Sequence, residues 1–276
     1  MRKINLQLAV LAWAALAAGG VASAAPLSEQ PAVRHKVELR KLRFEITPTF
    51  EASLAAYFSH TIAGGLKIEY HLTDSLSIGA MGFFGTGFNT GLMDQIVKSL
   101  GDTPVEDTKE PTREQAREHV NTIPLHGGIG LTFTPWFGKM GLFGKGFLSY
   151  DIYFSGGFGF AQTKNKFKGD DDATICELDC ENPDVTRRRS TDPRNDGPHN
   201  AGFNPGVQFG GGLHLYFGKF AALDLSLRNY MFTDNPSGLD FNADRAVTDA
   251  DRRFLSHLFV GLGVAFFLPT NPRISR

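Results

Sequence analysis

The chain contains 276 residues, with 28 Lys and Arg against 29 Asp and Glu, 31 Gly, 24 Phe and 2 Cys. A formal net charge of −1 gives no electrostatic footprint for nucleic acid, so we expect no nucleic-acid partner. The 2 Cys exclude a disulfide-framework miniprotein and a four-thiolate zinc site. Abundant Gly together with abundant Phe is typical of β-barrels, because helices disfavour Gly in their interiors.

Residues 1–24 have the pattern of an export signal peptide. Arg2 and Lys3 supply a positive start, residues 4–18 are apolar, and Ala22-Ser23-Ala24 matches a cleavage site. Residues 25–41 would then form a periplasmic N-terminal segment. No later run reaches about 18 apolar residues, so we expect no membrane-spanning helix, and a membrane protein would have to be a closed barrel.

Strict alternation of apolar and polar residues predicts the fold class. Across residues 42–58 every even position is apolar and the odd positions are mostly polar, which is the period of a β-strand. The pattern recurs in residues 62–72, 76–86, 123–134, 142–162, 207–217, 220–232 and 254–268. We therefore predict an all-β, eight-stranded antiparallel transmembrane barrel over residues 42–268, with ten strands as the alternative if the flanks of Asn121 or Phe203 also pair.

The predicted connections alternate between short and long. The short ones are residues 73–75, 135–141 and 218–219, and the long ones are residues 87–121, 163–203 and 233–253. Short periplasmic turns and long extracellular loops are typical of outer-membrane barrels, and residues 269–276 would be a periplasmic tail. A soluble barrel or sandwich with its apolar face inward is the alternative, but the polar faces lack the dense charge of a soluble surface.

Short motifs at the strand ends carry a family resemblance. They are Phe44-Glu45-Ile46-Thr47-Pro48, Tyr70-His71-Leu72-Thr73-Asp74, Arg228-Asn229-Tyr230 with Thr233-Asp234, and Phe266-Phe267-Leu268-Pro269. Over roughly residues 40–270 the chain resembles the outer-membrane β-barrel family of myxobacteria and related deltaproteobacteria. The resemblance implies the barrel fold and the outer membrane. Some members belong to the gliding-motility apparatus, so it also suggests a motility role, but it transfers no catalytic residue.

The polar strand faces supply the candidate site. An eight-stranded barrel has room inside only for side chains, so opposite charges there should pair and plug the lumen. The expected lumen residues are Arg43, Glu45, Glu51, Lys67, Glu69, His71, His126, Lys145, Asp151, His214, Asp224 and Arg228. A narrow gated channel is the alternative. No spacing resembles a hydrolase or metal signature, so we expect no enzyme, no catalytic residue, no cofactor and no metal ion.

The long connections contain two candidate helices. Residues 89–101 place Leu92, Ile96, Val97 and Leu100 on one side. Residues 112–120 open with a Thr112–Gln115 capping pattern. Such helices could be solvated insertions or could cap the barrel and dock a partner.

Residues 163–203 hold a Cys pair, an acidic run and a basic run. We expect a disulfide between Cys176 and Cys180, because the predicted compartment is oxidising and two thiols make a poor zinc site. The basic run 187–189 would be a lipopolysaccharide contact or a plain charged loop.

Two of the long connections, residues 163–203 and 233–253, also carry carboxylates that could bind Ca²⁺ or simply be solvated. They are Asp170, Asp171, Asp172, Asp234, Asp240, Asp244, Asp249 and Asp251.

Together these patterns predict a structural role. We expect a barrel that anchors a cell-envelope assembly, with gliding motility as the most specific version. Its partners would be outer-membrane lipid, lipopolysaccharide and other envelope proteins, and the sequence leaves the oligomeric state open. A passive channel or small-solute transporter is the alternative function.

Overall fold

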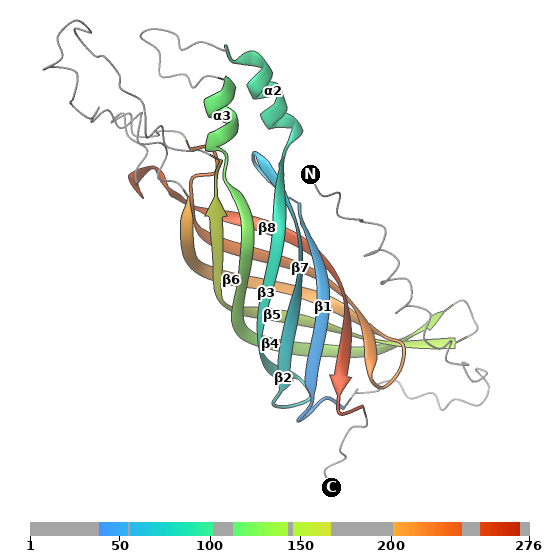
Figure 1. Ribbon diagram of the computed structural model, residues 1–276. Coiled ribbons are helices and arrows are strands. Elements are labelled where there is room, and N and C mark those ends of the chain that lie inside the picture. The colour runs from blue at the N-terminus through green and yellow to red at the C-terminus, as the bar shows by residue number, and fades with distance from the viewer. Residues whose placement is uncertain are drawn as a thin grey trace, which may run out of the picture.

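The computed structural model describes residues 39–54, 56–101, 113–142, 146–166, 201–238 and 249–270. These residues form one closed, fully antiparallel barrel in which each strand pairs with its neighbour in the chain (Figure 1). The ring closes between the first and last strands, where Phe44 lies opposite Leu268 and Ser53 lies opposite Phe259. Within the described residues, no helix is long and apolar enough to cross a membrane.

The barrel has eight strands, as the alternation predicts. They are β1 (Phe44–Ser53), β2 (Ser59–His71), β3 (Leu76–Asn89), β4 (Thr122–Leu142), β5 (Gly146–Lys164), β6 (Gly202–Tyr216), β7 (Ala221–Asp234) and β8 (Arg253–Leu268). The ten-strand alternative needed further pairing around Asn121 or Phe203. The residues after Asn121 and around Phe203 instead lengthen β4 and β6, and they form no additional strands among the described residues. We call the barrel end with the β2–β3 and β6–β7 turns the turn end, and the opposite end the loop end.

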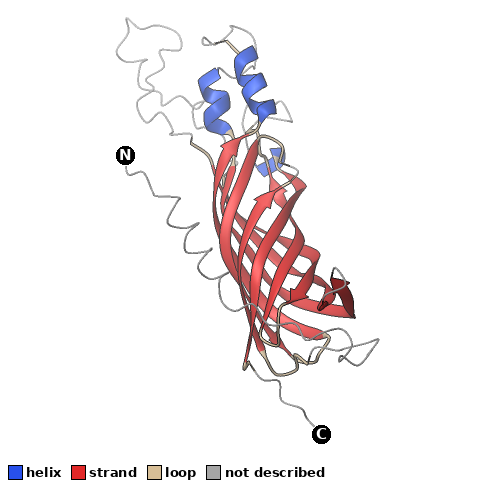
Figure 2. Cartoon of the chain, turned by 90° about the vertical axis from the view of Figure 1, so that its right-hand side faces the viewer, coloured by secondary structure: helices blue, strands red, loops and turns tan. Residues whose placement is uncertain are grey.

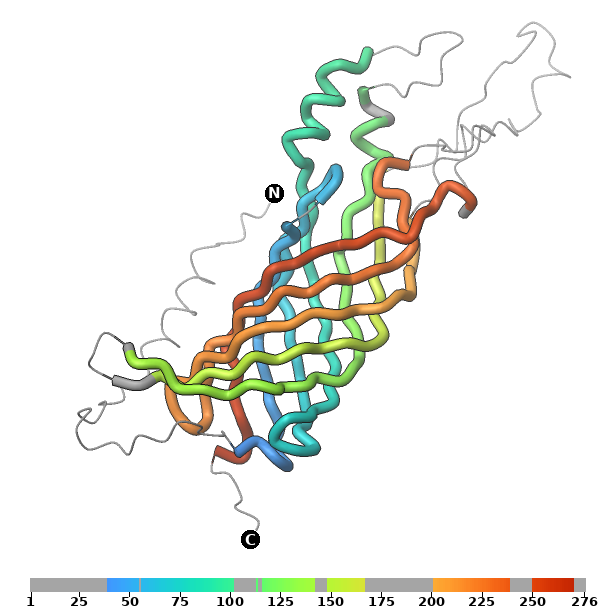
Figure 3. The backbone as a smooth tube through the Cα atoms, turned by 180° about the vertical axis from the view of Figure 1, so that it is seen from behind, coloured from blue at the N-terminus to red at the C-terminus, as the bar shows by residue number. Residues whose placement is uncertain are grey.

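The largest correction concerns the hairpin of β4 and β5. The predicted turn at residues 135–141 is wrong, because β4 continues through it to Leu142 and pairs with β5 along its whole length. The register shifts between Phe133 and Trp136, which is a β-bulge around Pro135. A bulge tolerates proline and reverses the alternation, so in sequence the strand resembles a turn. In Figures 1 and 3 this hairpin extends past the barrel wall.

The first strand is shorter than predicted. β1 ends at Ser53, and the apolar even positions that follow belong to the β1–β2 connection. Ser53 Oγ accepts a hydrogen bond of 2.9 Å from the backbone N–H of Thr61, which fixes the start of β2. Phe58, predicted to lie on the strand, instead packs against the helices at the loop end.

Apolar side chains point outward and polar ones inward around the ring. On β4, Ile129 is 59% exposed and Phe133 is 52% exposed, whereas Thr132 and Thr134 between and after them are buried. Outward Phe, Leu, Ile and Val recur on every strand. Only a lipid environment favours so continuous an apolar outer surface on a folded chain, so this is a membrane-spanning barrel.

Two layers of buried rings fill the lumen above and below its middle. Tyr230, Phe232 and Phe259 cluster toward the loop end, and Tyr216 and Phe267 cluster toward the turn end. Phe267, near the end of β8, is buried and faces inward. Between the two layers, Gly212 makes room for the buried side chain of Tyr153, because a Cβ at Gly212 would overlap the Tyr153 hydroxyl.

Two helices cover part of the loop end (Figure 2). α2 (Gly91–Ser99) begins after Thr90, whose hydroxyl accepts a hydrogen bond from Met93 N, and α3 is Arg113–His119. Met93, Val97, Ala116 and Val120 form the buried contact between them. The buried side is rotated from the prediction, because Met93 takes the place expected for Leu92, which is exposed. A short 3-10 turn, η2 (Asp249–Asp251), precedes β8.

Several expectations lie outside the described residues and stay predictions. They are the signal peptide of residues 1–24, most of the segment 25–41, residues 271–276 of the tail, Thr112, Lys145, the Cys176–Cys180 disulfide, the basic run 187–189, and Asp170, Asp171, Asp172, Asp240 and Asp244.

Candidate functional site: the lumen network

The candidate site is a group of charged side chains in the middle of the barrel. Every strand contributes to the inward face, and each of the members below is at most 3% exposed. We define the lumen network as Arg40, Glu45, Glu51, Lys67, Glu69, His71, His126, Asp151, His214, Asp224 and Arg228. Ten of these come from the alternating strands, and Arg40 precedes β1.

Lys67 lies among three carboxylates. Its Nζ is 2.9 Å from Glu45 Oε1, 3.7 Å from Glu69 Oε1 and 3.8 Å from Asp224 Oδ2. The ammonium group also lies 4.8 Å from the ring centre of Tyr153. A buried ammonium so surrounded is paired rather than isolated, which is the condition for a stable buried charge.

Arg228 makes the matching contact nearer the loop end. Its Nη1 forms an ion pair with Glu51 Oε1, and its Nη2 lies 3.8 Å from Asp224 Oδ2. The second oxygen of Glu51 is 3.1 Å from His126 Nε2. The His126 ring stacks on Phe83 and Phe259, which seals this pair from the loop end.

His214 connects the two halves of the network. Its Nδ1 is 3.0 Å from Asp151 Oδ1, while its Nε2 is 3.4 Å from Asp224 Oδ1 and 3.6 Å from Glu45 Oε1. The hydroxyls of Tyr153 and Tyr216 donate hydrogen bonds to Asp224 and Asp151. The network is therefore continuous across the lumen, from β1 to β7.

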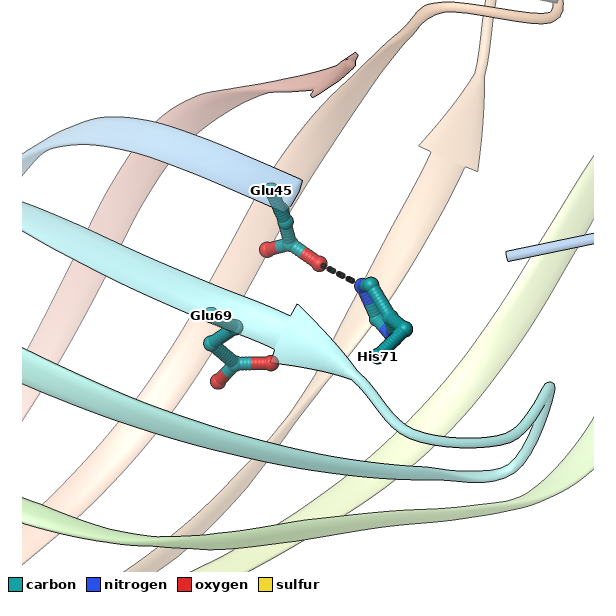
Figure 4. Close-up of side chains that lie close together, drawn as sticks. All are labelled: Glu45, Glu69 and His71. Carbon is teal, nitrogen blue, oxygen red and sulfur yellow. Dashed lines mark hydrogen bonds and ion pairs between the residues drawn. The ribbon is translucent and has the colours of Figure 1, made fainter. Parts of the chain in front are cut away.

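Glu45, Glu69 and His71 bring ligand-type atoms within 4.8 Å of one another (Figure 4). These atoms already have protein partners. Glu45 bonds Lys67, His71 and Thr47. Glu69 accepts hydrogen bonds of 2.8 Å from both Ser77 and Thr132. Because Lys67 supplies the positive charge, the group is part of the ion-pair network.

Arg43 was expected to pair with carboxylates in the lumen, but it bonds backbone carbonyls instead. Its guanidinium donates to the backbone carbonyls of Leu39, Lys219, Phe267 and Pro269 at the turn end. It thereby ties together the chain before β1, the β6–β7 turn and the end of β8. The structure thus places Arg43 at the turn-end rim, below the network.

Arg40 is the member that sequence reasoning missed. It belongs to the predicted periplasmic segment, yet it is 1% exposed and its Nη1 lies 3.1 Å from Asp151 Oδ2. Its backbone N–H donates to Asp74 Oδ1 at 2.8 Å, which holds the segment across the turn end. The alternation that predicted the first strand was followed only from residue 42, so Arg40 lay outside every predicted strand face.

A small pocket lies at the loop end, lined in part by Asn121, Asp234 and His257. Asp234 Oδ1 accepts hydrogen bonds of 2.8 Å from Asn121 Nδ2 and 2.9 Å from Asn235 N. His257 stacks on Phe232 with ring centres 4.2 Å apart. These contacts give Asp234 a structural role at the mouth, and Phe259 separates the pocket from the network below.

Comparison with known proteins gave structural matches alone. No protein-family profile and no curated protein matches the chain. The N-terminal β-barrel domain of Pseudomonas aeruginosa OprF matches with 13% identity and TM-score 0.39, covering 83% of this chain and 98% of that one. P. aeruginosa OprG matches with 11% identity and TM-score 0.39, covering 84% and 99%. A de novo designed transmembrane β-barrel matches with 8% identity and TM-score 0.33, covering 86% and 100%. Because the TM-scores are this low, the barrel fold is taken from the strand pairing of this chain and not from these matches.

Proposed function

We propose that the protein is an outer-membrane β-barrel that serves as a structural anchor and interaction subunit of a cell-envelope assembly. The observation that carries the proposal is the filled lumen. Lys67, Arg228 and His214 link carboxylates from opposite walls, and buried rings lie above and below them. A barrel filled in this way offers surfaces rather than a path for solutes.

The outward apolar surface supports the membrane location. A chain exported through the predicted signal peptide and closed into such a barrel fits the bacterial outer membrane. In the proposed orientation the turn end faces the periplasm, and α2, α3 and the long connections face outward, where lipopolysaccharide and envelope proteins are the partners. A gliding-motility assembly is the most specific version, and it rests on the family resemblance alone.

No catalytic step belongs to the proposal. His71, His126 and His214 each bond a carboxylate that is itself paired with Lys67, Arg228 or Arg40. Such contacts hold charges in place. The alternative function, a narrow channel, requires the ion pairs of the lumen network to separate. Conductance measurements decide between the anchor and the channel.

Proximity labelling tests the anchor role. A promiscuous biotin ligase placed between α2 and α3, at residues 102–112, would label neighbours in living cells. An unrelated outer-membrane barrel of equal abundance with the same ligase is the control. We expect a defined set of envelope proteins enriched over the control and lost in cells without the protein. Labelling indistinguishable from the control, together with a normal envelope in deletion cells, would contradict the proposal.

A further inference from the structure

The pocket at the loop end contains a buried carboxylate that differs from those of the lumen network. Every carboxylate of the network has a Lys or Arg nitrogen at most 3.8 Å away. Asp234 is 2% exposed, and within the described residues it forms no ion pair with a Lys or Arg. Because a buried carboxylate without a counter-charge is costly, the pocket beside Asp234 is suited to a cation.

The protein uses one of the two oxygens of Asp234. Oδ1 accepts the hydrogen bonds from Asn121 and Asn235, which fix the orientation of the carboxylate. The neighbouring Arg252 is engaged elsewhere, since its Nη2 donates to the Thr233 carbonyl at 3.0 Å. Oδ2 of Asp234 is therefore held in place and left for another partner.

His257 supplies a second ligand atom. Its Nε2 lies 3.9 Å from Asp234 Oδ2 and is buried, with no hydrogen-bond partner among the described residues. Stacking on Phe232 holds the imidazole ring in position. Two ligand atoms of a tetrahedral zinc ion lie about 3.4 Å apart, given bonds of about 2.05 Å. A movement of about half an ångström would therefore let both atoms bind one ion.

The size of the pocket limits what it can hold. Its volume is about 30 Å³, which is room for about two groups the size of a water molecule. Ser59 Oγ lines the same pocket, and it too is buried without a hydrogen-bond partner among the residues that the structure describes. An ion with one bound water fits this space, and Ser59 is placed to bond that water.

We propose that Asp234 and His257 bind a divalent cation of the zinc type at the mouth of the barrel, with Ser59 bonding a water on the ion. An imidazole nitrogen beside a carboxylate suits Zn²⁺, whereas Ca²⁺ takes oxygen ligands. The ligands come from β7 and β8, and Ser59 begins β2, so the ion links three strands. The expectation of no metal ion rested on sequence spacing, which does not bring Asp234 and His257 together.

Calorimetric titration of the untagged protein in detergent with ZnCl₂ tests the proposal. Cys176→Ser and Cys180→Ser are present in every sample, so that thiols are excluded as ligands. We expect one Zn²⁺ per barrel. His257→Phe keeps a ring for stacking and removes the nitrogen, and Asp234→Asn keeps an acceptor oxygen and removes the charge. Each should weaken binding at least roughly 10-fold.

His60→Phe is the matched control, because His60 also stacks beside a Phe but lies outside the pocket, so binding should be unchanged. Circular dichroism should show the same strand content in all variants. No saturable zinc binding, or binding as tight in both pocket variants as in the unchanged pocket, would overturn the proposal. An equal loss in His60→Phe, or Ca²⁺ that competes as strongly as Zn²⁺, would also overturn it, because the ligands would then be different.

Discussion

Lys67 and Ile68 are neighbours on β2, yet they lie in opposite environments. Lys67 is 1% exposed and bonded to Glu45 in the lumen, whereas Ile68 is 43% exposed on the outer surface. In a soluble protein the two would exchange places. In lipid the apolar side chain gains by facing outward, so the interior must be stabilised by paired charges and hydrogen bonds instead. The inside of the barrel should therefore be sensitive to lost partners, and the outside to added charge.

The largest loss of stability is expected from a substitution in the lumen network. Glu51→Ala leaves Arg228 buried beside one distant carboxylate, and it removes the partner of His126. We expect a loss of about 3–5 kcal/mol in the free energy of unfolding, because the remaining charge is uncompensated. Urea unfolding in lipid vesicles measures it. Glu51→Leu combined with Arg228→Leu removes the whole pair and should recover most of the loss; a double variant as unstable as Glu51→Ala would refute this account of the pair.

The outer surface provides the second test. Ile129→Arg places a charge on the lipid-facing side of β4, and we expect it to cost about 2–4 kcal/mol if this position lies near the bilayer midplane. Leu54→Arg, beyond the end of β1 at the loop end, should cost about 0–1 kcal/mol on the same scale. The same unfolding assay compares the two. Equal costs at both positions would mean that the outer surface does not face a bilayer.

The helices α2 and α3 form a helical cap, and a substitution in their contact should destabilise this cap without destabilising the barrel. Met93→Ala opens the contact between α2 and α3, and we expect about 2 kcal/mol of local destabilisation, at the low end for a buried Met because a small cap can collapse. Leu92→Ala on the exposed side of the same helix is the control and should change little. Hydrogen exchange of α2 and α3 reports the difference. A larger effect of Leu92→Ala than of Met93→Ala would contradict this arrangement and favour the helix orientation predicted from sequence.

The smallest effect is a pH dependence of the cap. Burial lowers the pKa of His119, at the end of α3, below its ordinary value. The unfolded cap then binds the proton more readily, so cap stability should fall as the pH drops below about 6.5, the ordinary His value. Exchange of α3 amides at pH 7 and pH 5 measures this. A His119→Gln variant should lose the pH dependence, and an unchanged dependence would assign it to another group.

Alternation was sufficient to predict the strands and the inward direction of the charged residues. It could not assign the pairs, because partners across the lumen are distant in the chain: Glu51 and Arg228 are separated by 177 positions. It also failed where a bulge changes the period, since Pro135 resembles a turn in sequence although the strand continues past it. Arg40 could not be found in this way, because it enters the lumen from irregular backbone and belongs to no strand face.

Planar-bilayer recording of the purified barrel tests the central claim most directly. If Lys67, Arg228 and His214 close the lumen, the protein should insert without steps above roughly a few tens of picosiemens, since an eight-stranded interior is only wide enough for side chains. Glu51→Ala, refolded in the same lipid, shows whether the network itself is the barrier. Regular conductance steps from the unchanged protein would contradict a filled lumen and favour the narrow channel.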